Sequence, residues 1–314
     1  MKPKKEKILV TGGAGYVGTI LVNQLLERGY QVRVLDNLLY GQTYHLYFFS
    51  NKNFEFIKGD IRSKKTIKEA LKGIDVIMHL AAIVGFPACR ANPRLAREVN
   101  VNGTRNINTL RSKNQTIIFA STSSVYGAVE GICTEKSPLN PASLYGKTKT
   151  IAEKEVLGKG NAVVLRFATG FGHSMMPRFD LLINDFVYQA VKNKQLIVFD
   201  KNNKRSFIHV QDMARSYVFA LEHFNEMKNN AFNVGSEKMN FTKEEIALKI
   251  KEKTPYQLFF SGTGKDEDLR NYEVSYQKIR NIGFKTEVDI NEGLDELIKG
   301  FKSLPSTKEF FSQI

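Results

Sequence analysis

The sequence lacks an apolar run long enough to cross a membrane, and it contains only two cysteines, Cys89 and Cys133, in 314 residues. Two cysteines provide neither a disulfide framework nor the ligand spacing of a zinc site, and so low a count is typical of a reducing cytoplasm. We therefore expect a cytoplasmic protein that has no membrane span and no bound metal. The sequence also shows no internal repeat and no low-complexity linker.

Acidic residues are few relative to basic ones, since 32 Asp and Glu stand against 46 Lys and Arg, for a net charge of +14. A basic balance favours anionic partners such as nucleic acid, an acidic membrane surface or phosphate-bearing small molecules. The basic residues are spread along the chain without interleaved aromatics, which argues against nucleic-acid binding. The one dense run, KPKKEK at residues 2–7, is interpreted as a solvated tail and not as a signal peptide, because TGGAG follows the next short strand.

The sequence does contain a regular alternation of strand and helix patterns up to about residue 167. Short apolar stretches such as KILV, QVRVLD, DVIMHLAA and TIIFAS are separated by amphipathic helical stretches. This alternation predicts an α/β fold, a doubly wound parallel sheet with helices on both faces. The pattern then loosens, so we expect a smaller, discontinuous α/β lobe. The predicted sheet domain comprises residues 1–166 and 206–236, and the predicted lobe comprises residues 167–205 and 237–314.

A glycine loop, TGGAGYVG, joins the first predicted strand to the first predicted helix. Gly12, Gly15 and Gly18 let the backbone turn tightly and approach a pyrophosphate, and the helix directs its free N–H groups toward the phosphates. Asp36 ends the next strand, where its carboxylate can accept hydrogen bonds from an adenosine ribose and would repel a 2′-phosphate. The loop therefore predicts NAD binding, with a plain structural turn as the alternative.

Two further strand ends carry polar residues. Asp60 can reach an adenine amino group or cap the next helix, and the sequence leaves both roles open. HLAA at residues 79–82 has small residues that leave room for a cofactor across the sheet edge, and His79 is interpreted as a packed strand residue.

The stretch YGKTK places Tyr145 and Lys149 four residues apart, on one face of a helix. A tyrosine is a poor base at neutral pH because its ordinary pKa is about 10, but a neighbouring ammonium favours the phenolate. The phenolate can then take a proton from a sugar hydroxyl while a hydride leaves the same carbon for a nicotinamide.

The motifs TGGAGYVG, HLAA, VNVNGT, STSSVYG, NPASLYGKTK and KRSFIHVQDMA follow one another along nearly the whole chain. Together they resemble the extended short-chain dehydrogenase/reductase family, in its nucleotide-sugar epimerase/dehydratase branch. The resemblance implies a Rossmann fold, NAD as cofactor and a nucleotide-diphosphate sugar as substrate. It also implies a homodimer formed through the helix after HLAA and the helix bearing Tyr145. The residues expected in that contact are Leu95, Val99, Ile107 and Ile151.

The resemblance further implies that Thr122 hydrogen-bonds the reacting sugar oxygen, that Tyr145 is the base, and that Lys149 also holds the nicotinamide ribose. Asn100 matches a position that supports the active site from a neighbouring helix. The full set of expected cofactor contacts is Gly12, Gly15, Tyr16, Val17, Asp36, Asn37, Asp60, Ile61, Leu80, Ala81, Ala82, Asn100, Tyr145 and Lys149.

The two residues after Thr122 depart from part of the family. In its 4,6-dehydratases they are an acidic pair that expels water, whereas here they are Ser123 and Ser124. A hydroxyl is a poor substitute for a carboxylic acid at neutral pH. We therefore predict oxidation at carbon 4 of the sugar without dehydration, with net 4-epimerisation or net 4-dehydrogenation as the outcome.

The substrate end of the site is expected in the smaller lobe. By resemblance, Arg205 and Arg270 bind the diphosphate, and a guanidinium fork suits phosphate. The stretches VGFPACRANP and RFDLLINDF look like a subgroup with dehydrogenases of GDP-linked heptoses. Cys89 is either a packing residue or part of the sugar pocket. The full set of expected substrate contacts is Val84, Cys89, Ser123, Ser124, Thr169, Asn184, Arg205 and Arg270.

Two alternative functions remain beside this prediction. One is a 4,6-dehydratase with atypical acid and base residues. The other is a catalytically silent module that senses NAD or binds RNA, to which the charge of +14 would be suited. The presence of Thr122, Tyr145 and Lys149 together favours an enzyme.

Overall fold

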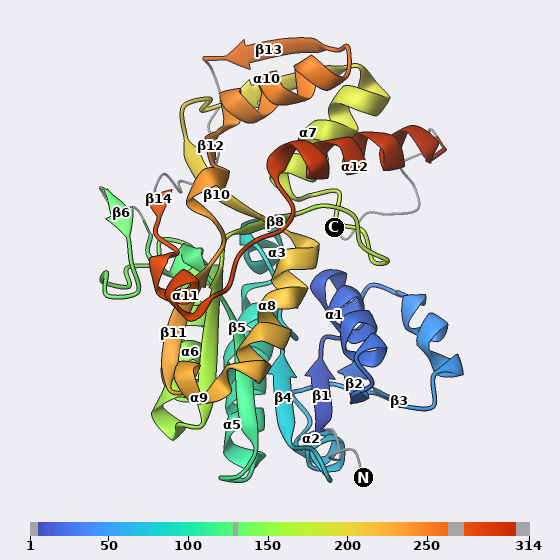
Figure 1. The fold of residues 1–314 in the computed structure, drawn as a ribbon, viewed down its shortest axis with the longest axis vertical. Coiled ribbons are helices and arrows are strands. Elements are labelled where there is room, and N and C mark those ends of the chain that lie inside the picture. The colour runs from blue at the N-terminus through green and yellow to red at the C-terminus, as the bar shows by residue number, and fades with distance from the viewer. Residues whose placement is uncertain (1–5, 128–130, 263–272, 306–314) are drawn as a thin grey trace.

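The computed structural model describes residues 6–127, 131–262 and 273–305. At its centre is a seven-stranded sheet in which every neighbouring pair of strands is parallel (Figure 1). The strands are β1 (Lys7–Thr11), β2 (Gln31–Asp36), β3 (Phe54–Lys58), β4 (Val76–His79), β5 (Thr116–Thr122), β7 (Ala162–Phe167) and β11 (Asn230–Val234). Their order is β11-β7-β5-β4-β1-β2-β3, so the direction of winding reverses between β1 and β4. The predicted doubly wound fold is confirmed.

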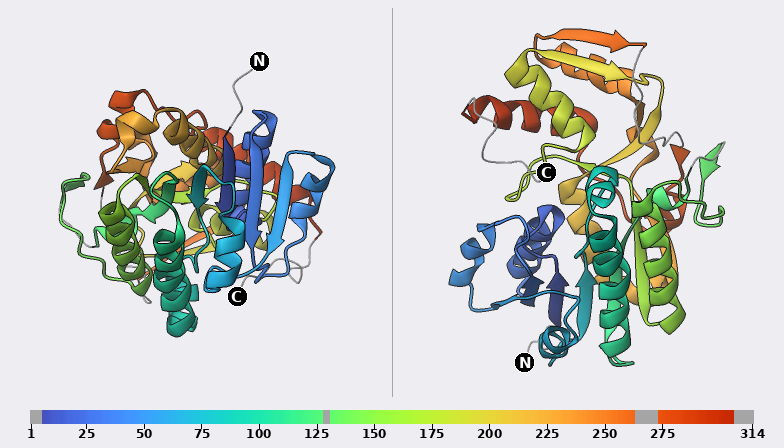
Figure 2. Two further views of the ribbon diagram at one scale, coloured as in Figure 1. Left: turned by 90° about the horizontal axis from the view of Figure 1, so that it is seen from below. Right: turned by 180° about the vertical axis from the view of Figure 1, so that it is seen from behind.

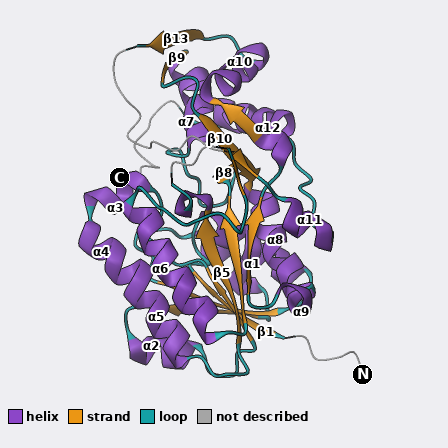
Figure 3. Cartoon of the chain, turned by 90° about the vertical axis from the view of Figure 1, so that its left-hand side faces the viewer, coloured by secondary structure: helices purple, strands orange, loops and turns teal. Residues whose placement is uncertain are grey.

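Helices cover both faces of this sheet (Figure 3). On one face lie α1 (Tyr16–Glu27), α8 (Val210–Glu222), α9 (Phe224–Met227) and α11 (Gln277–Ile282). On the other face lie α2 (Lys64–Ala70), α4 (Pro93–Arg97), α5 (Thr104–Leu110) and α6 (Leu144–Lys159). Strand side chains alternate between the two cores: in β5, Ile118 packs on the α1 side, whereas Ile117 and Phe119 pack on the α6 side. Burial of both faces explains why these strands are almost entirely apolar.

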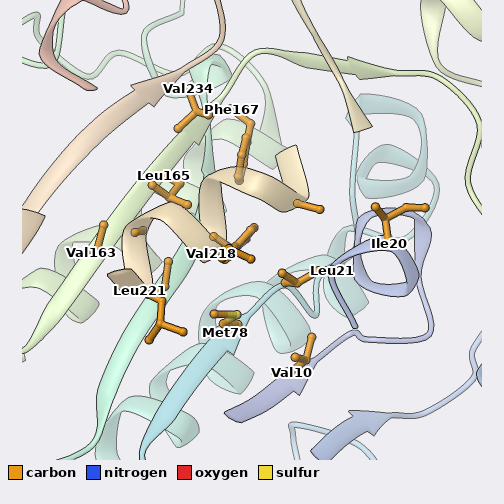
Figure 4. Packing of buried hydrophobic residues seen from close by; sticks show 14 of the residues in the cluster. Val10, Ile20, Leu21, Met78, Val163, Leu165, Phe167, Val218, Leu221 and Val234 are labelled. Carbon is orange, nitrogen blue, oxygen red and sulfur yellow. The ribbon is translucent and has the colours of Figure 1, made fainter. Parts of the chain in front are cut away.

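The core on the α1 side joins the central strands to the helices that cover this face. Val10, Met78, Leu165 and Val234 project from β1, β4, β7 and β11 toward the helices, and Leu21 of α1 and Val218 of α8 pack against them (Figure 4). These side chains are almost fully buried. The packing fixes α1, and with it the glycine loop that precedes this helix.

A smaller lobe lies beyond the carboxyl ends of the central strands (Figures 1 and 2). Its strands are β8 (Thr169–Phe171), β10 (Lys204–His209) and β12 (Asn240–Thr242) in one sheet, and β9 (Gln195–Phe199) paired with β13 (Gln257–Ser261). Its helices α7 (Leu182–Tyr188), α10 (Lys243–Lys253) and α12 (Ile290–Ser303) enclose a core around Phe171, Leu294 and Phe301. Within the described residues, no helix has the length and apolar character that a membrane crossing needs.

Short elements connect these parts. They are α3 (Phe86–Ala91), the paired strands β6 (Ile132–Cys133) and β14 (Glu273–Val274), the 3-10 turns η1 (Tyr44–Ser50), η3 (Ser123–Val125) and η5 (Glu237–Met239), and the π-helical stretches η2 (Glu98–Gly103) and η4 (Gln189–Asn193). Val274, Tyr276 and Ile279 pack into the core on the α1 side. The chain therefore returns to the sheet domain after α10, within the range 237–314 assigned to the lobe. The remainder of the proposed domain division stays a prediction.

A close backbone contact positions α6 against the end of β5. A Cβ atom at Gly146 would lie 2.6 Å from the carbonyl oxygen of Ser124 in η3. The helix begins just before this glycine, where the Ser143 hydroxyl accepts a hydrogen bond from the Gly146 N–H at 3.0 Å. The contact brings the first turn of α6, which carries Tyr145, to the end of β5, which carries Thr122.

We expect Gly146→Ala to lower the free energy of unfolding by roughly 1–3 kcal/mol, because the new methyl group would push α6 away from backbone atoms that cannot rotate aside. Gly158→Ala, in the same helix but with no atom within 4 Å of the added Cβ, is the matched control. That variant is expected to gain about 0.5–1 kcal/mol from improved helix propensity. Urea denaturation of both variants measures the difference, and equal shifts would contradict the proposed contact.

Candidate active site

A cavity of about 310 Å³ opens at the carboxyl ends of the central strands. Its wall combines the glycine loop, the ends of β2, β4 and β5, the start of α6, and residues from the first part of the lobe. It lies where the strand order reverses, which is where open α/β sheets bind ligands. The sheet therefore presents one concave site that both the domain and the lobe complete.

The glycine loop fits a dinucleotide diphosphate. Gly12 has a φ of +73°, and a Cβ there would lie 2.7 Å from the backbone nitrogen of Ala81. A Cβ at Gly18 would lie 2.2 Å from the Gly12 carbonyl oxygen. Gly15 is the N-cap of α1 and has no side chain that could cap the first turn. The N–H groups of that turn therefore remain available to an anion in the cavity.

Asp36, the last residue of β2, and Asp60, two residues after the end of β3, line the cavity. Asp36 is 8% exposed, and its carboxylate accepts hydrogen bonds from the N–H groups of Ala14 at 3.1 Å and Leu38 at 2.9 Å. Burial raises the pKa of this carboxyl, and these hydrogen bonds oppose the rise. Asp36 is thereby held in a fixed orientation at the cavity wall, and its contact with a ribose stays a prediction.

Asp60 forms an ion pair with Arg62 at 2.8 Å and accepts a hydrogen bond from Asn37 at 3.2 Å. The Arg62 hydrogen bond holds the pKa of the Asp60 carboxyl below its usual value. The helix-capping alternative for Asp60 is wrong, because the Ser63 hydroxyl caps α2. Arg62 also lines the cavity, and the sequence analysis did not include it.

Thr122, Tyr145 and Lys149 all line the cavity, as predicted for the catalytic set. Thr122 is the last residue of β5, and its Oγ1 accepts a hydrogen bond from the Ser124 N–H at 3.1 Å and donates one to the Ser124 hydroxyl at 3.2 Å. Tyr145 lies in the first turn of α6, and Lys149 lies one turn later on the same face. The end of β5 thus supplies a hydroxyl group to this wall of the cavity, and the start of α6 supplies a phenol and an amine.

Lys149 is 2% exposed, and its ammonium lies 4.5 Å from the centre of the Phe119 ring. Burial lowers the pKa of Lys149 to about 7, although the negative charge of Glu153 opposes the change. Near neutral pH the amine is therefore poised between its two protonation states. A ligand that supplies hydrogen-bond acceptors to it would favour the ammonium.

A buried polar network lies directly behind this set. Glu153, one turn after Lys149, forms an ion pair with Arg166 of β7, and both side chains are almost fully buried. The Ser121 hydroxyl donates to Glu153 at 2.8 Å, and Arg166 donates to the Tyr126 hydroxyl at 2.9 Å. Arg166 thus neutralises the carboxylate nearest to Lys149 on α6. This network was not predicted from the sequence, although the spacing of Tyr145, Lys149 and Glu153 by four residues is a signal that could have indicated it.

Asn100 lies behind the cavity and not in its wall. Its side chain is 1% exposed and bonds both the N–H and the carbonyl of Ile83, at 2.8 and 2.9 Å. It also donates to the Thr148 hydroxyl at 3.1 Å. Asn100 therefore fastens the loop after β4 to α6, from a π-helical stretch of the kind often found at functional sites. The structure gives it the supporting position, outside the residues that line the cavity, and its direct cofactor contact stays a prediction.

His79 is a packed strand residue, as interpreted from the sequence. It is fully buried, and its ring nitrogens lie 2.6 Å from the Thr11 hydroxyl and 2.9 Å from the Thr104 hydroxyl. Burial lowers its pKa to about 3, so it stays neutral and takes no part as a proton carrier.

The remaining predicted cofactor residues also line the cavity: Tyr16, Val17, Asn37, Ile61, Leu80, Ala81 and Ala82. Of the predicted substrate residues, Val84, Ser124 and Thr169 line it. Ser123, Cys89, Asn184 and Arg205 are buried outside its wall. Arg270 lies outside the described residues, so its predicted role stays a prediction.

The structure assigns packing or positioning roles to two of the residues outside the wall. The Cys89 thiol is fully buried and donates to the Ile83 carbonyl at 3.4 Å, so the packing alternative is the correct one. The Asn184 amide donates to the carbonyls of Gly172 at 3.2 Å and Arg178 at 2.8 Å, and accepts from the Gly172 N–H at 3.0 Å. Asn184 thus holds a loop together and does not face a nucleotide in the cavity.

The sheet, the glycine loop and the Thr122, Tyr145 and Lys149 set define an NAD-binding enzyme of the Rossmann class. Residues 8–235 match the NAD dependent epimerase/dehydratase family, and the chain belongs to this family. The matched range includes the whole glycine loop and all three residues of the predicted catalytic set. The resemblance inferred from the motifs, the enzyme class and the cofactor NAD are confirmed.

Relatives with known names extend over nearly the full chain. The chain is 31% identical over 313 residues to a putative UDP-glucose 4-epimerase of Methanocaldococcus jannaschii, a match that covers 94% of this chain and 98% of the relative. It is 30% identical over 318 residues to UDP-glucuronic acid decarboxylase 1 of Arabidopsis thaliana, covering 96% and 71%.

Among solved structures, UDP-glucuronic acid 4-epimerase from Bacillus cereus, in complex with UDP-glucuronic acid and NAD, has a TM-score of 0.83 and 26% identity. The match covers 94% of this chain and 99% of that one. These three relatives share NAD-dependent nucleotide-sugar chemistry but not one reaction. The family therefore defines the kind of chemistry, while the particular reaction has to be argued from this chain's own site.

We expect Lys149→Met to change how stability depends on pH in the ligand-free protein. The pKa of Lys149 is about 7 in the folded state and about 10.4 in an unfolded chain, so the unfolded state binds more protons between these values. The contribution of Lys149 to the free energy of unfolding therefore rises with pH across this window, by up to about 2 kcal/mol from pH 7 to pH 9.

Urea denaturation at several pH values measures this contribution as the difference between wild type and variant. Lys147→Met, which removes a positive charge from the exposed side of the same helix, is the control. A wild-type minus Lys149→Met difference that stays constant with pH would show that the amine is not desolvated as described.

Proposed function

We propose that this enzyme oxidises carbon 4 of a nucleotide-diphosphate sugar with NAD, without dehydration, and that its net outcome is 4-epimerisation. The observation that carries the proposal is the meeting of Thr122, Tyr145 and Lys149 with the glycine loop in one cavity. The names of the M. jannaschii and B. cereus relatives, both 4-epimerases, support the choice of carbon 4. Release of the 4-keto sugar is the alternative outcome, with a GDP-linked heptose among the candidate substrates.

Each residue of the set has a distinct task in this reaction. When bound, NAD would supply the redox chemistry, by accepting a hydride from the sugar carbon and, for net 4-epimerisation, returning it to the opposite face of the same carbon. Tyr145 takes the proton from the hydroxyl on that carbon, and the ammonium of Lys149 favours the phenolate form of Tyr145. The Thr122 hydroxyl turns from Ser124 to the reacting oxygen, while the Ser124 N–H continues to hold Thr122 Oγ1.

The absence of dehydration is supported by where acidic groups lie. Among the described residues of the cavity wall, the acids are Asp36 and Asp60. Asp36 ends β2 and Asp60 follows β3, whereas Thr122 ends β5, which is separated from β2 by β4 and β1. Next to Thr122 the wall offers the Ser124 hydroxyl in place of a carboxylic acid. A hydroxyl does not protonate a leaving group effectively at neutral pH.

Tyr145→Phe is expected to reduce turnover of the substrate by about 10²-fold or more, because the proton acceptor is lost. NADH affinity should stay close to that of wild type, since only one hydroxyl is removed from the wall. Turnover is followed by NMR of nucleotide sugars carrying different bases, and NADH binding by fluorescence titration. Full activity in this variant would remove Tyr145 as the base.

The product of the wild-type enzyme is expected to have the same mass as the substrate, with inverted configuration at carbon 4. Mass spectrometry and NMR of the same reaction mixture test this directly. A ketone accompanied by NADH absorbance would favour net dehydrogenation. Loss of one water from the sugar would contradict the reaction proposed here and favour the dehydratase alternative.

The residues predicted to form the homodimer contact lie in α4, η2, α5 and α6. Ile151 of α6 is 46% exposed and is available for such a contact. Ile107 is fully buried in the core on the α6 side, so it cannot contribute, and this part of the prediction is wrong. Dimerisation itself and a cytoplasmic location stay predictions, the first of which light scattering can test.

A further inference from the structure

One arginine of the cavity wall has no role in the reaction described above. Arg178 lies between β8 and α7, and its side chain is 11% exposed. Its Nε and Nη2 donate to the two carboxylate oxygens of Asp180 at 2.6 and 2.5 Å. Its carbonyl accepts the Asn184 hydrogen bond described above. The guanidinium is therefore held in one orientation by its neighbours in the lobe.

The segment that carries Arg178 is fastened to the amino end of α1. The Tyr16 hydroxyl donates to the Gly172 carbonyl at 2.8 Å, and the Ser174 hydroxyl donates to the Tyr16 carbonyl at 2.6 Å. The hydroxyls of Ser174 and Thr19 lie 3.0 Å apart. Tyr16 is the first residue of α1, directly after the glycine loop. The first part of the lobe therefore contacts the sheet domain at the amino end of α1, where the free N–H groups of the helix face the cavity.

Arg178 shares this part of the wall with Tyr16 and with Tyr40 from the loop after β2. Burial raises the pKa of both tyrosines, and in each case the charge of Arg178 opposes the rise. Tyr16 directly follows the glycine loop, and Tyr40 follows β2, the strand that ends in Asp36.

The cationic groups of the wall have different partners. Within the described residues, the wall contains three such side chains: Arg62, Lys149 and Arg178. Arg62 is paired with Asp60 and Glu98, and Lys149 belongs to the catalytic set. In the same part of the chain, Arg178 Nη1 has no protein acceptor, because Asp180 takes Nε and Nη2. This nitrogen is a donor left for an anion.

We propose that Arg178 binds the diphosphate of the NAD dinucleotide from the lobe side of the cavity, and that Asp180 orients the guanidinium for this contact. The inference deepens the proposed function and rests on its cofactor. It means that cofactor binding links the lobe to the sheet domain through one charged hydrogen bond. The diphosphate of the nucleotide sugar is the other source of the same chemistry, and the position of Arg178 beside Tyr16 and Tyr40 favours the cofactor.

The test compares Arg178→Gln with wild type by calorimetric titration of NADH, ADP-ribose and adenosine. We expect the dissociation constants of NADH and ADP-ribose to rise about tenfold or more, as for loss of a hydrogen bond between charged groups. The dissociation constant of adenosine, which has no phosphate, should stay the same. Because Arg178→Gln leaves Asp180 without its partner, the double variant Arg178→Gln/Asp180→Asn is measured as well, with the same expected result.

Arg280→Gln, which removes an arginine paired with Glu237 outside the cavity, is the control and should not change NADH affinity. Titration of UDP into the NAD-loaded enzyme tests the alternative that Arg178 binds the diphosphate of the nucleotide sugar. A loss of UDP affinity with unchanged NADH affinity would overturn the proposal, and so would unchanged affinity for every ligand in both variants. If no nucleotide sugar is turned over, the proposed reaction fails, while the NADH and ADP-ribose titrations still decide the role of Arg178.

Discussion

The close approach of α6 to the end of β5 is the constraint on which the site depends. No side chain separates Gly146 from the Ser124 carbonyl, so the helix start and the strand end are in direct backbone contact. Thr122 belongs to one of these elements, and Tyr145 and Lys149 belong to the other. Asn100 adds a second fastening, because it joins α6 to the loop after β4. The proposed reacting groups are thus held in place by backbone packing and buried hydrogen bonds.

Burial then determines the electrostatics of the same groups. Lys149 is enclosed by the sheet and the helices, which lowers its pKa toward neutrality. The carboxylate of Glu153 would oppose this change strongly if it were alone, but it is paired with Arg166. The Glu153–Arg166 pair therefore forms a rigid polar layer behind the site. Because its charges cancel, it does not keep Lys149 protonated at every pH. A cofactor that brings acceptors to this amine would change its protonation, which would couple cofactor binding to the proposed activation of Tyr145.

The lobe contributes through its first loop as well as through its sheet. Asn184 closes the loop onto itself, and Tyr16 and Ser174 fasten it to α1. Arg178 is consequently presented to the cavity from a segment that belongs to the lobe in sequence but lies against the sheet domain in space. Through this arrangement, a side chain of the lobe lines the same cavity as the glycine loop.

The sequence by itself determined the elements and the chemistry that are local in the chain. The glycine loop, the alternating strands and helices, and the four-residue spacing of Tyr145 and Lys149 are patterns set by backbone geometry, so they predicted the fold, NAD and part of the cavity wall. Which side chains face the cavity was decided by tertiary packing: Asn184 and Cys89 hold neighbouring loops instead. Arg178 could not be found from its surroundings in the sequence, because its place beside Tyr16 depends on contacts between residues more than 150 positions apart. Contacts of that range arise only when the chain folds, since local patterns carry no information about them.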